Sequence, residues 1–276
     1  MVTDRSADWE TAKAFSTSWN NLPRESVYTL EQFEDWMFPL GRNDFLGKEV
    51  LELGCGNASL MIHALSWEPT HIWGVELGAS TISAERNLEV SGYKNWSIVQ
   101  DDLVTYRSPG SDLVYSVGVL HHLADPHKGF QAVIQNTKRG GQFHCWVYAE
   151  EGNKFVIRFV DPMRKIVSRL PWWITKYLIA TPLAGILYVI VKCLVTRWSG
   201  ILRTKLPLID YCLWLSRQKY KFVRHVVFDQ LVAPRTSYIS ERIIRNWLNE
   251  SKDIDQKSAY IIFRNGNSWK FGGKVS

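Results

Sequence analysis

Short apolar runs and amphipathic stretches alternate along residues 48–150, and this alternation is the main regularity of the chain. The apolar runs predict five strands, within residues 50–53, 70–80, 95–103, 111–126 and 140–150. The stretches between them carry apolar residues at helical spacing, as in ISAERNLEVSG, which Gly92 ends. Because strands and helices follow one another without interruption, the pattern predicts an α/β fold with a parallel sheet and helices on both faces.

The two ends of the chain predict elements that complete this fold. Residues 9–19 and 29–41 each predict a helix, and Thr29 and Gln32 form a capping-box pattern at the start of the second. Residues 259–273 contain two apolar runs joined by Asn-Gly, which is typical of an antiparallel hairpin. The expected units are N-terminal helices that cover the site (1–46), the main domain (47–152 and 226–276) and a helical insert (153–225).

The alternation stops at Gly152, and the insert that follows is apolar and basic. From Lys154 to His225 there are 14 Lys or Arg residues but two Asp residues, an excess of twelve positive charges, whereas the rest of the chain has a net charge of −6. Tyr177–Val191 is an uncharged run of fifteen residues. A helix that spans a bilayer needs roughly 20 apolar residues, so no spanning helix is expected.

Two interpretations of the insert remain. In the first, which we favour, it is a helical cap between the fifth strand and the following helix, and its apolar residues form a core and a substrate pocket. In the second, its apolar face contacts a membrane peripherally through residues 172–198 while basic side chains meet anionic headgroups. The charge excess suits an anionic partner in either case.

Composition limits the class of protein further. The 276 residues suffice for one large α/β domain with an insert. Four cysteines are widely spaced and form no C-x-x-C pair, so neither a disulfide framework nor a metal site is expected. The first residues, MVTDRSADWETAKAF, are polar and carry acids early, unlike a signal peptide. We therefore expect a cytoplasmic protein, with membrane association as the alternative that the insert leaves open.

The stretch KEVLELGCGNASL, residues 48–60, predicts a nucleotide-binding turn from a buried strand into a helix that Asn57 or Ser59 caps. A dinucleotide site requires a third glycine where this chain has Ser59. The spacing instead resembles motif I (E-x-G-x-G-x-G/A) of the class I S-adenosylmethionine (SAM) methyltransferases, particularly those that act on small molecules. The matching residues are Glu52, Gly54, Gly56 and Ala58. The resemblance implies a Rossmann-like, seven-stranded sheet with SAM as cofactor.

Acidic residues at the ends of the next strands extend the expected cofactor site. Glu76 ends the second strand, 20 residues after Gly56, where a carboxylate accepts hydrogen bonds from both ribose hydroxyls. Asp101 and Asp102 end the third strand, where the family has an acid that receives the adenine amine, and Asp102 fits the usual pattern better. The other expected cofactor contacts are Asn57, Leu77, Leu103, Ser116 and Trp19.

Trp19 belongs to the run FSTSW, which resembles an F-x-x-x-W element that helps to close over SAM in some small-molecule methyltransferases. The alternative is that Phe15 and Trp19 simply pack against each other at i, i+4 spacing.

Several side chains could contact or activate the methyl acceptor. Two histidines follow the fourth strand, where imidazole could take a proton from a hydroxyl or amine, although many family members use a histidine there as a wall of the SAM pocket. Further candidates precede the last helix, which Ser240 is expected to cap, and these could equally hold their own loop together. The expected catalytic candidates are His121, His122, Asp229 and Tyr238, and the expected acceptor contacts are Tyr28 and Arg235.

The motifs that are missing narrow the reaction. The chain has no [DNS]-P-P-[YF] element and no Pro-Cys dipeptide, which methylases of exocyclic base amines and of pyrimidine C5 use. The expected function is therefore SAM-dependent methyl transfer (an EC 2.1.1 transferase) to an oxygen or nitrogen of a small molecule with an anionic or apolar part. The alternatives are an RNA methyltransferase, which the isoelectric point near 9.1 suggests, and a non-catalytic SAM-fold protein that docks on membranes.

Overall fold

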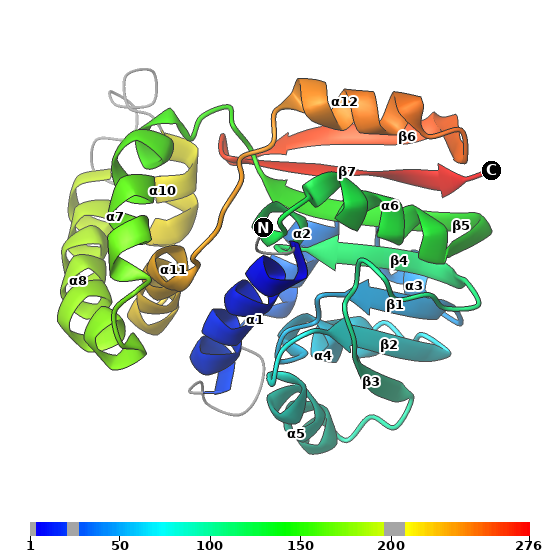
Figure 1. Ribbon diagram of the computed structural model, residues 1–276, viewed down its shortest axis with the longest axis horizontal. Coiled ribbons are helices and arrows are strands. Elements are labelled where there is room, and N and C mark those ends of the chain that lie inside the picture. Colours follow the sequence, from blue (N-terminus) through cyan, green and yellow to red (C-terminus); the bar gives the residue numbers. More distant parts are fainter. Residues whose placement is uncertain (1–3, 21–27, 196–207) are drawn as a thin grey trace.

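The computed structural model describes residues 4–20, 28–195 and 208–276, which form an α/β structure around one seven-stranded sheet (Figure 1). The strand order is β3-β2-β1-β4-β5-β7-β6. Strands β1 to β5 pair in parallel, and β7 pairs antiparallel with both β5 and β6. The strands are β1 (Glu49–Leu53), β2 (His71–Glu76), β3 (Trp96–Gln100), β4 (Ser111–Val117), β5 (Thr137–Tyr148), β6 (Ile254–Arg264) and β7 (Ser268–Val275). The predicted parallel sheet and the predicted closing hairpin are both confirmed.

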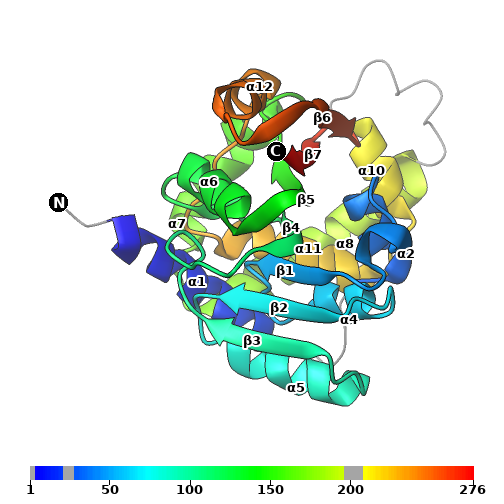
Figure 2. The ribbon, with the colours of Figure 1, turned by 90° about the vertical axis from the view of Figure 1, so that its right-hand side faces the viewer.

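Successive residues of each strand pack on opposite faces of the sheet, as the period of two in a strand requires. In β1, Leu51 and Leu53 join a core cluster with residues of α6 and α12, whereas Val50 joins a second cluster with residues of α2, α4 and α5. Figure 2 shows α6 and α12 on one side of the sheet and α2 and α4 on the other. The helices of these two layers are α2 (Leu30–Met37), α3 (Arg42–Phe45), α4 (Ser59–Leu65), α5 (Thr81–Ser91), α6 (Pro126–Asn136) and α12 (Glu241–Glu250).

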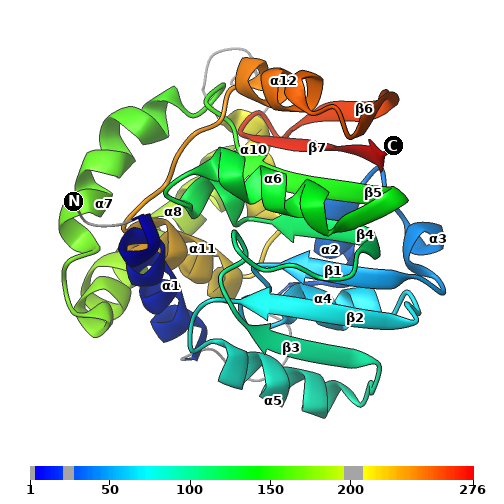
Figure 3. The same cartoon turned by 45° about the vertical axis from the view of Figure 1, so that its right-hand side comes forward.

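The N-terminal helix α1 (Asp4–Asn20) lies at the carboxyl ends of the parallel strands, beside the loops that follow β2 and β4 (Figure 3). The backbone N–H of Ala124 donates to Asp8 Oδ1 (2.6 Å), and the backbone N–H of Ser80 donates to Ser16 Oγ (3.2 Å). The next helix, α2, begins at the predicted capping box of Thr29 and Gln32, which is confirmed. The two N-terminal helices therefore lie in different places: α1 lies over the loops that follow β2 and β4, whereas α2 packs on one face of the sheet.

The insert occupies the connection between β5 and α12 and lies beyond the carboxyl ends of the parallel strands (Figure 1). Its described helical segments are η2 (Val156–Val160), α7 (Asp161–Val167), η3 (Ile174–Ala180), α8 (Thr181–Val189), η4 (Ile190–Val195), α10 (Ile209–Ser216) and α11 (Tyr220–Val232). The expected end of the insert at residue 225 was wrong, because this position lies inside α11. Phe228 and Leu231 pack with Val167 and Ala180 of the insert, so the helical insert extends to Val232.

The apolar centre of the insert forms one long helical segment, Ile174–Cys193, of 20 residues with mean hydropathy 1.8. Among the described residues it is the one helix that is long and apolar enough, by length and composition, to cross a membrane. The expectation from the uncharged run Tyr177–Val191 underestimated this helix, because the helix also includes Lys176 and Lys192. Residues 196–198, at the end of the expected membrane-contact segment, lie outside the described residues.

Two local predictions differ from the structure. The fifth strand was expected within residues 140–150, but β5 already begins at Thr137, and its pairing with β4 shifts register between Thr137 and Gln142. Ser240 stands at the N-cap of α12 without a capping hydrogen bond from its side chain. Instead, the backbone N–H of Glu241 donates to Glu151 Oε1 at 3.0 Å, so an acid just before the insert caps this helix.

Candidate functional site

The loop between β1 and α4 is held in a conformation that favours glycine. Gly54 and Gly56 have φ values of 83° and 56°, and a Cβ on Gly54 would lie 2.5 Å from Val119 Cγ2. The backbone N–H of Gly54 donates to Val75 O (2.8 Å), and that of Gly56 donates to Glu76 Oε2 (2.9 Å). The loop is thus tied to the end of β2, and it lines a cavity at the carboxyl edge of the sheet.

The start of α4 differs from the expected side-chain cap. The N-cap residue is Ala58, which has a left-handed conformation (φ 61°) and makes no side-chain cap. Asn57 Oδ1 accepts hydrogen bonds from the backbone N–H (3.2 Å) and the hydroxyl (2.7 Å) of Ser59. The other amide atom, Asn57 Nδ2, is buried without a hydrogen-bond partner in the described chain, and Asn57 lines the cavity. A buried amide donor without a partner is costly, so it marks a position that suits a ligand oxygen.

Glu76 stands where two loops converge on the cavity. Its two carboxylate oxygens accept the backbone N–H groups of Gly56 and Gly78, each at 2.9 Å. Burial raises the pKa of Glu76, while these N–H groups act in the opposite direction. Because each carboxylate oxygen can accept a second hydrogen bond, Glu76 is able to receive a vicinal diol while it holds the loops in place.

The adjacent aspartates after β3 have different positions. Asp102 lines the cavity and accepts the backbone N–H of Val104 at 2.9 Å. Asp101 is exposed, does not line the cavity, and accepts the backbone N–H of Asp102 at 2.7 Å. The expected cofactor residues Leu77 and Leu103 both line the cavity. The structure thus brings Asp102, rather than Asp101, to the site.

Ser116 was expected at the cofactor, but the structure places it inside the sheet. Its side chain is fully buried, its hydroxyl donates to Leu53 O (2.9 Å), and it does not line the cavity. Val117, Gly118 and Val119 line the cavity in its place. Ser116 therefore joins the ends of β1 and β4, and it supports the glycine loop after β1 from inside the sheet.

Helix α1 covers the cavity with aromatic side chains. Trp19 and Phe15 both line it, and the Trp19 ring lies 5.3 Å from His225 and 6.2 Å from Tyr28. The hydroxyl of Ser18 donates to Asp229 Oδ1 at 3.1 Å, which links α1 to the insert. Trp19 and Tyr28, both predicted at the site, line the cavity. Phe15 and Trp19 also face the cavity, so packing against each other is not their only contact.

The two neighbouring histidines have different environments. His121 is fully buried outside the cavity lining, and both of its ring nitrogens lack a hydrogen-bond partner in the described chain. His122 lines the cavity, and its Nδ1 lies 2.8 Å from Arg235 O. Since a carbonyl can only accept, Nδ1 carries the proton and Nε2 the lone pair. Burial lowers the pKa of His122 to about 4, so this imidazole is neutral at pH 7.

Asp229 and His225 face the cavity from α11, where they are four residues apart. His225 Nε2 lies 3.1 Å from Asp229 Oδ2, without the alignment of a hydrogen bond. Burial raises the pKa of Asp229, and its neighbours His225, Ser18 and Lys176 act against this shift. The pair can therefore hold or move a proton in the half of the cavity that the insert closes.

Arg235 and Tyr238 were expected at the acceptor, but neither lines the cavity. Arg235 contributes its carbonyl to His122, and its own side chain is exposed. The hydroxyl of Tyr238 accepts from Nη2 of Arg164 at 3.3 Å, in a buried network that also includes Gln230. Arg164 is 1% exposed and belongs to α7, so the structure makes Tyr238 part of the attachment of the insert. Charge counting did not single out Arg164, because nothing local distinguishes it from its exposed basic neighbours.

Glu52 lies under the glycine loop and is also part of the cavity lining. Its Oε2 accepts the hydroxyl of Tyr115 at 2.8 Å, and its side chain is buried. Burial raises the pKa of Glu52 to about 8, with the Tyr115 hydroxyl acting in the opposite direction. A neutral carboxyl group at this position can donate a hydrogen bond as well as accept one.

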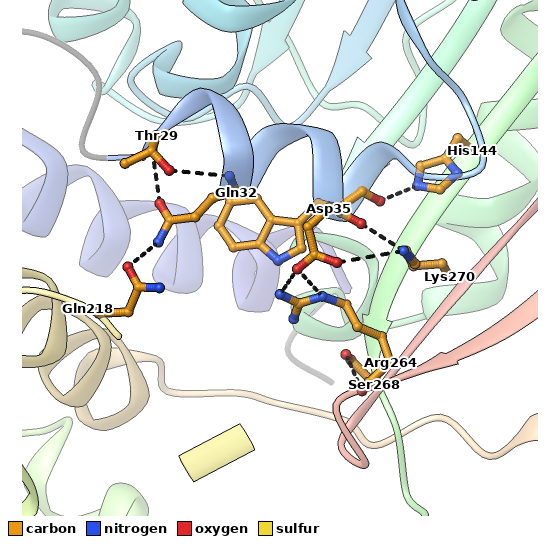
Figure 4. Close-up of polar contacts among 9 residues, drawn as sticks. Thr29, Gln32, Asp35, His144, Gln218, Arg264, Ser268 and Lys270 are labelled. Carbon is orange, nitrogen blue, oxygen red and sulfur yellow. Dashed lines mark hydrogen bonds and ion pairs between the residues drawn. The ribbon is translucent and has the colours of Figure 1, made fainter. Parts of the chain in front are cut away.

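The end of the cavity away from the loop is aromatic and cationic. Arg264, at the end of β6, lines it, lies over Trp214 (5.1 Å) and Trp36 (5.9 Å), and donates from Nε and Nη2 to Asp35 (Figure 4). Within the described residues, Arg264 Nη1 has no hydrogen-bond partner. Lys270 Nζ donates to Asp35 O (2.7 Å), and burial lowers its pKa to about 8. Two cations therefore share one carboxylate at this end.

Further polar atoms at this end of the cavity also lack partners among the described residues. They are Trp36 Nε1, Trp146 Nε1 and Asn267 Oδ1, all on residues that line the cavity. The sequence offered no signal for them, because tryptophan is frequent along the whole chain. In the described part of the chain, no group of three or more His, Cys, Asp or Glu side chains could hold a metal ion, and the cysteines are free.

Comparison with known proteins identifies the family of the central region. Residues 51–143 match the family model described as a methyltransferase domain. An uncharacterised protein of Synechococcus is 33% identical over 124 residues, which are 42% of this chain and 30% of that protein. The ubiquinone biosynthesis O-methyltransferase of Erwinia tasmaniensis is 25% identical over 43% of this chain and 53% of its own length. The chain thus spans about half or less of the curated relatives that it matches.

A solved structure agrees over a longer part of the chain. The magnesium protoporphyrin IX methyltransferase of Synechocystis PCC 6803, crystallised with S-adenosylhomocysteine (SAH), superposes with a TM-score of 0.51 over 90% of this chain and 82% of its own length. Its sequence identity is 13%, so the agreement concerns the fold alone.

Proposed function

We propose that this chain, whose residues 51–143 match a methyltransferase domain and whose sheet has the class I methyltransferase fold, transfers a methyl group from SAM to an oxygen or nitrogen of a small acceptor molecule. One observation carries the proposal. A single cavity extends from the glycine loop, Glu76 and Asp102 to the aromatic and cationic end at Arg264, and α1 and the insert cover it. Such a cavity suits a cofactor at one end and an organic acceptor at the other.

The residues at the loop end fit SAM. Glu76 has carboxylate oxygens suited to the ribose hydroxyls, Asp102 is suited to the adenine amine, and Asn57 Nδ2 is a buried donor without a partner. The backbone of Gly54 and Gly56 leaves space that side chains would fill. When bound, SAM supplies a methyl group that its sulfonium sulfur activates, so orientation of the acceptor accounts for much of the rate.

A neutral imidazole faces the same cavity. His122 carries its proton on Nδ1, held by Arg235 O, and presents the Nε2 lone pair as a proton acceptor. Asp229, with His225 beside it, is a second candidate proton acceptor, on the side of the cavity that the insert covers. His121 is excluded from direct contact with an acceptor by its burial outside the cavity lining.

The position of Arg264 supports the proposal that the methyl acceptor carries an anionic group. Arg264 Nη1 is available, and the indole N–H groups of Trp36 and Trp146 are buried donors without partners in the described chain. Lys270 does not line the cavity, but it adds positive charge beside Asp35, the partner of Arg264. A carboxylate would satisfy these donors with charge-assisted hydrogen bonds, while the surrounding rings suit an aromatic or other apolar body. The anion site thus lies on β6, β7 and α2 rather than in the basic insert where the sequence suggested it.

Isothermal titration calorimetry with SAM and with SAH tests the cofactor part of this proposal. We expect both to bind with one site per chain, and the absence of binding by either would refute the enzyme function. Radiolabelled SAM and a panel of aromatic hydroxy acids, with their methyl esters as neutral counterparts, then test the acceptor class. Arg264→Gln should leave SAM binding unchanged and abolish transfer to the acids.

The RNA alternative is tested in the same series. Transfer to total RNA, with RNA binding that weakens steeply as salt rises, would replace the small-molecule acceptor.

A further inference from the structure

The outer surface of the insert exposes an unusual number of apolar side chains. Twelve of the twenty large hydrophobic side chains that are exposed among the described residues lie between residues 155 and 190. On the helical segment that includes η2 and α7, and at its end, they recur every three or four residues, which places them on one helical face. This row consists of Phe155, Phe159, Met163, Ile166 and Leu170. A second row lies on and just before the helix Ile174–Cys193 and consists of Trp173, Tyr177, Leu178, Leu183, Ile186, Val189 and Ile190.

The opposite side of the helix Ile174–Cys193 packs against other helices of the insert. Ala180 packs with Phe228 and Leu231 of α11, and Ala184 packs with Val223 and with Leu215 of α10. Only 28% of the most apolar window of the Ile174–Cys193 helix is buried in the chain. Figure 1 shows α8 at the outer edge of the molecule, with other helices of the insert between α8 and the sheet. The two apolar rows, here called the outer apolar face, therefore point away from the protein core and have no partner in the described chain.

Basic side chains accompany the outer apolar face. The exposed ones between residues 154 and 193 are Lys154, Arg158, Lys165, Arg169 and Lys192. The one acid in this range, Asp161, is paired with Arg164 (2.9 Å) and lies 3.9 Å from Lys165. An apolar surface with several cations and one paired acid is complementary to the interface of an anionic bilayer, where apolar side chains enter the acyl boundary and cations meet phosphate groups.

We propose that the outer apolar face docks this protein on the surface of an anionic phospholipid bilayer. A second copy of the chain is the less suitable occupant, because two faces of the same positive charge would repel each other. A spanning orientation of Ile174–Cys193 would carry α10 and α11, and with them the polar residues His225 and Asp229, into hydrocarbon or would separate them from their helix. Docking along the surface keeps these contacts and covers only the side that is exposed. The inference is independent of methyl transfer, because it rests on residues outside the cavity.

Vesicle co-sedimentation of the full chain tests this inference. The two vesicle types are phosphatidylcholine alone and phosphatidylcholine with about one third phosphatidylglycerol. We expect stronger binding to the anionic vesicles, and a decrease when salt rises, because the cations are solvent-exposed. Absence of binding to the anionic vesicles would refute the proposal.

Matched substitutions locate the contact. Phe159→Glu together with Ile186→Glu should lower the partition coefficient on anionic vesicles at least about tenfold. The control is Ile82→Glu on α5, because Ile82 and Ile186 are exposed to the same degree, 58% and 60%. The control should bind as the parent does. Thermal unfolding followed by circular dichroism, and SAM titration, verify that each variant is folded.

Each other outcome counts against the proposal. Equal loss of binding in Ile82→Glu would mean that the apolar rows are not the contact. If light scattering shows a dimer that Ile186→Glu dissociates, while vesicles do not bind, the face is an interface between copies. Protein that resists extraction from the vesicles by high salt and alkaline buffer would be spanning the bilayer rather than docked on it.

Discussion

Glu76→Gln tests the central feature of the site, the carboxylate that joins the glycine loop to the end of β2. In the parent, Oε2 accepts the N–H of Gly56 and Oε1 accepts the N–H of Gly78, each at 2.9 Å. Glutamine has the same shape, but one oxygen becomes an NH₂ group, which cannot accept. Whichever way the amide turns, one backbone N–H faces a donor, and one of the two ribose hydroxyls loses its acceptor.

The expected loss of SAM affinity follows from these contacts. A hydrogen bond to a charged group is worth about 1.5–3 kcal/mol and a neutral one about 1 kcal/mol, so the variant loses one charged bond and weakens another. The lost bond costs about 1.5–3 kcal/mol and the weakened one about 0.5–2 kcal/mol, and their sum of about 2–5 kcal/mol corresponds to roughly a 30- to 4,000-fold increase in the dissociation constant. Burial raises the pKa of Glu76. When the solution is acidified, Glu76 therefore takes up a proton at a higher pH than an ordinary carboxylate does, and the SAM affinity of the parent should start to fall at that higher pH.

Isothermal titration calorimetry with SAM at constant pH measures this loss, and differential scanning calorimetry verifies that the variant is folded. A folded Glu76→Gln variant that binds SAM within threefold of the parent would refute the assignment of Glu76 to the ribose. The reasoning would also fail if Glu76→Gln and the parent showed the same dependence of affinity on pH.

Three further predictions concern neighbouring positions. Asp102→Asn should weaken SAM binding about tenfold while Asp101→Asn changes it less than about twofold, measured by the same titration, because only Asp102 lines the cavity. Gly54→Ala should lower the free energy of unfolding in urea by at least about 2 kcal/mol, since φ is 83° and the added Cβ would lie 2.5 Å from Val119; an unchanged midpoint would contradict the loop geometry. Burial raises the pKa of Glu52 from 4.5 to about 8, so between these values the folded chain keeps a proton that the unfolded chain has released. The stability of the parent relative to Glu52→Gln should therefore fall as pH rises, by up to about 1.4 kcal/mol per pH unit, and parallel stability curves for the two proteins would exclude a raised pKa.

Predictions based on local backbone requirements agree well with the structure. The glycine loop after β1, the acid at the end of β2, the capping box at Thr29 and the Asn-Gly hairpin all depend on residues a few positions apart. Their conformations follow from sterics and short-range hydrogen bonds, and such preferences are visible in the sequence.

Predictions that needed a side chain to face one way rather than another were less reliable. Ser116 supports the loop from inside the sheet, and Tyr238 holds the insert through Arg164 instead of meeting an acceptor. Each lies within a few residues of a position that does line the cavity. Strand pairing and helix rotation decide between such neighbours, and both depend on contacts far away in the chain.

The sequence by itself determined the class I methyltransferase sheet and the residues at the glycine-loop end of the cavity, because the geometry of a glycine turn and of strand-end acids depends on local spacing. Only the tertiary structure decided which charged side chains line the cavity and which are exposed to solvent. Arg264, from β6, is brought to the cavity by the antiparallel hairpin, whereas five exposed basic residues of the insert accompany the outer apolar face: Lys154, Arg158, Lys165, Arg169 and Lys192. The physical reason is that burial is a property of packing between distant segments, and the same arginine or lysine serves either environment.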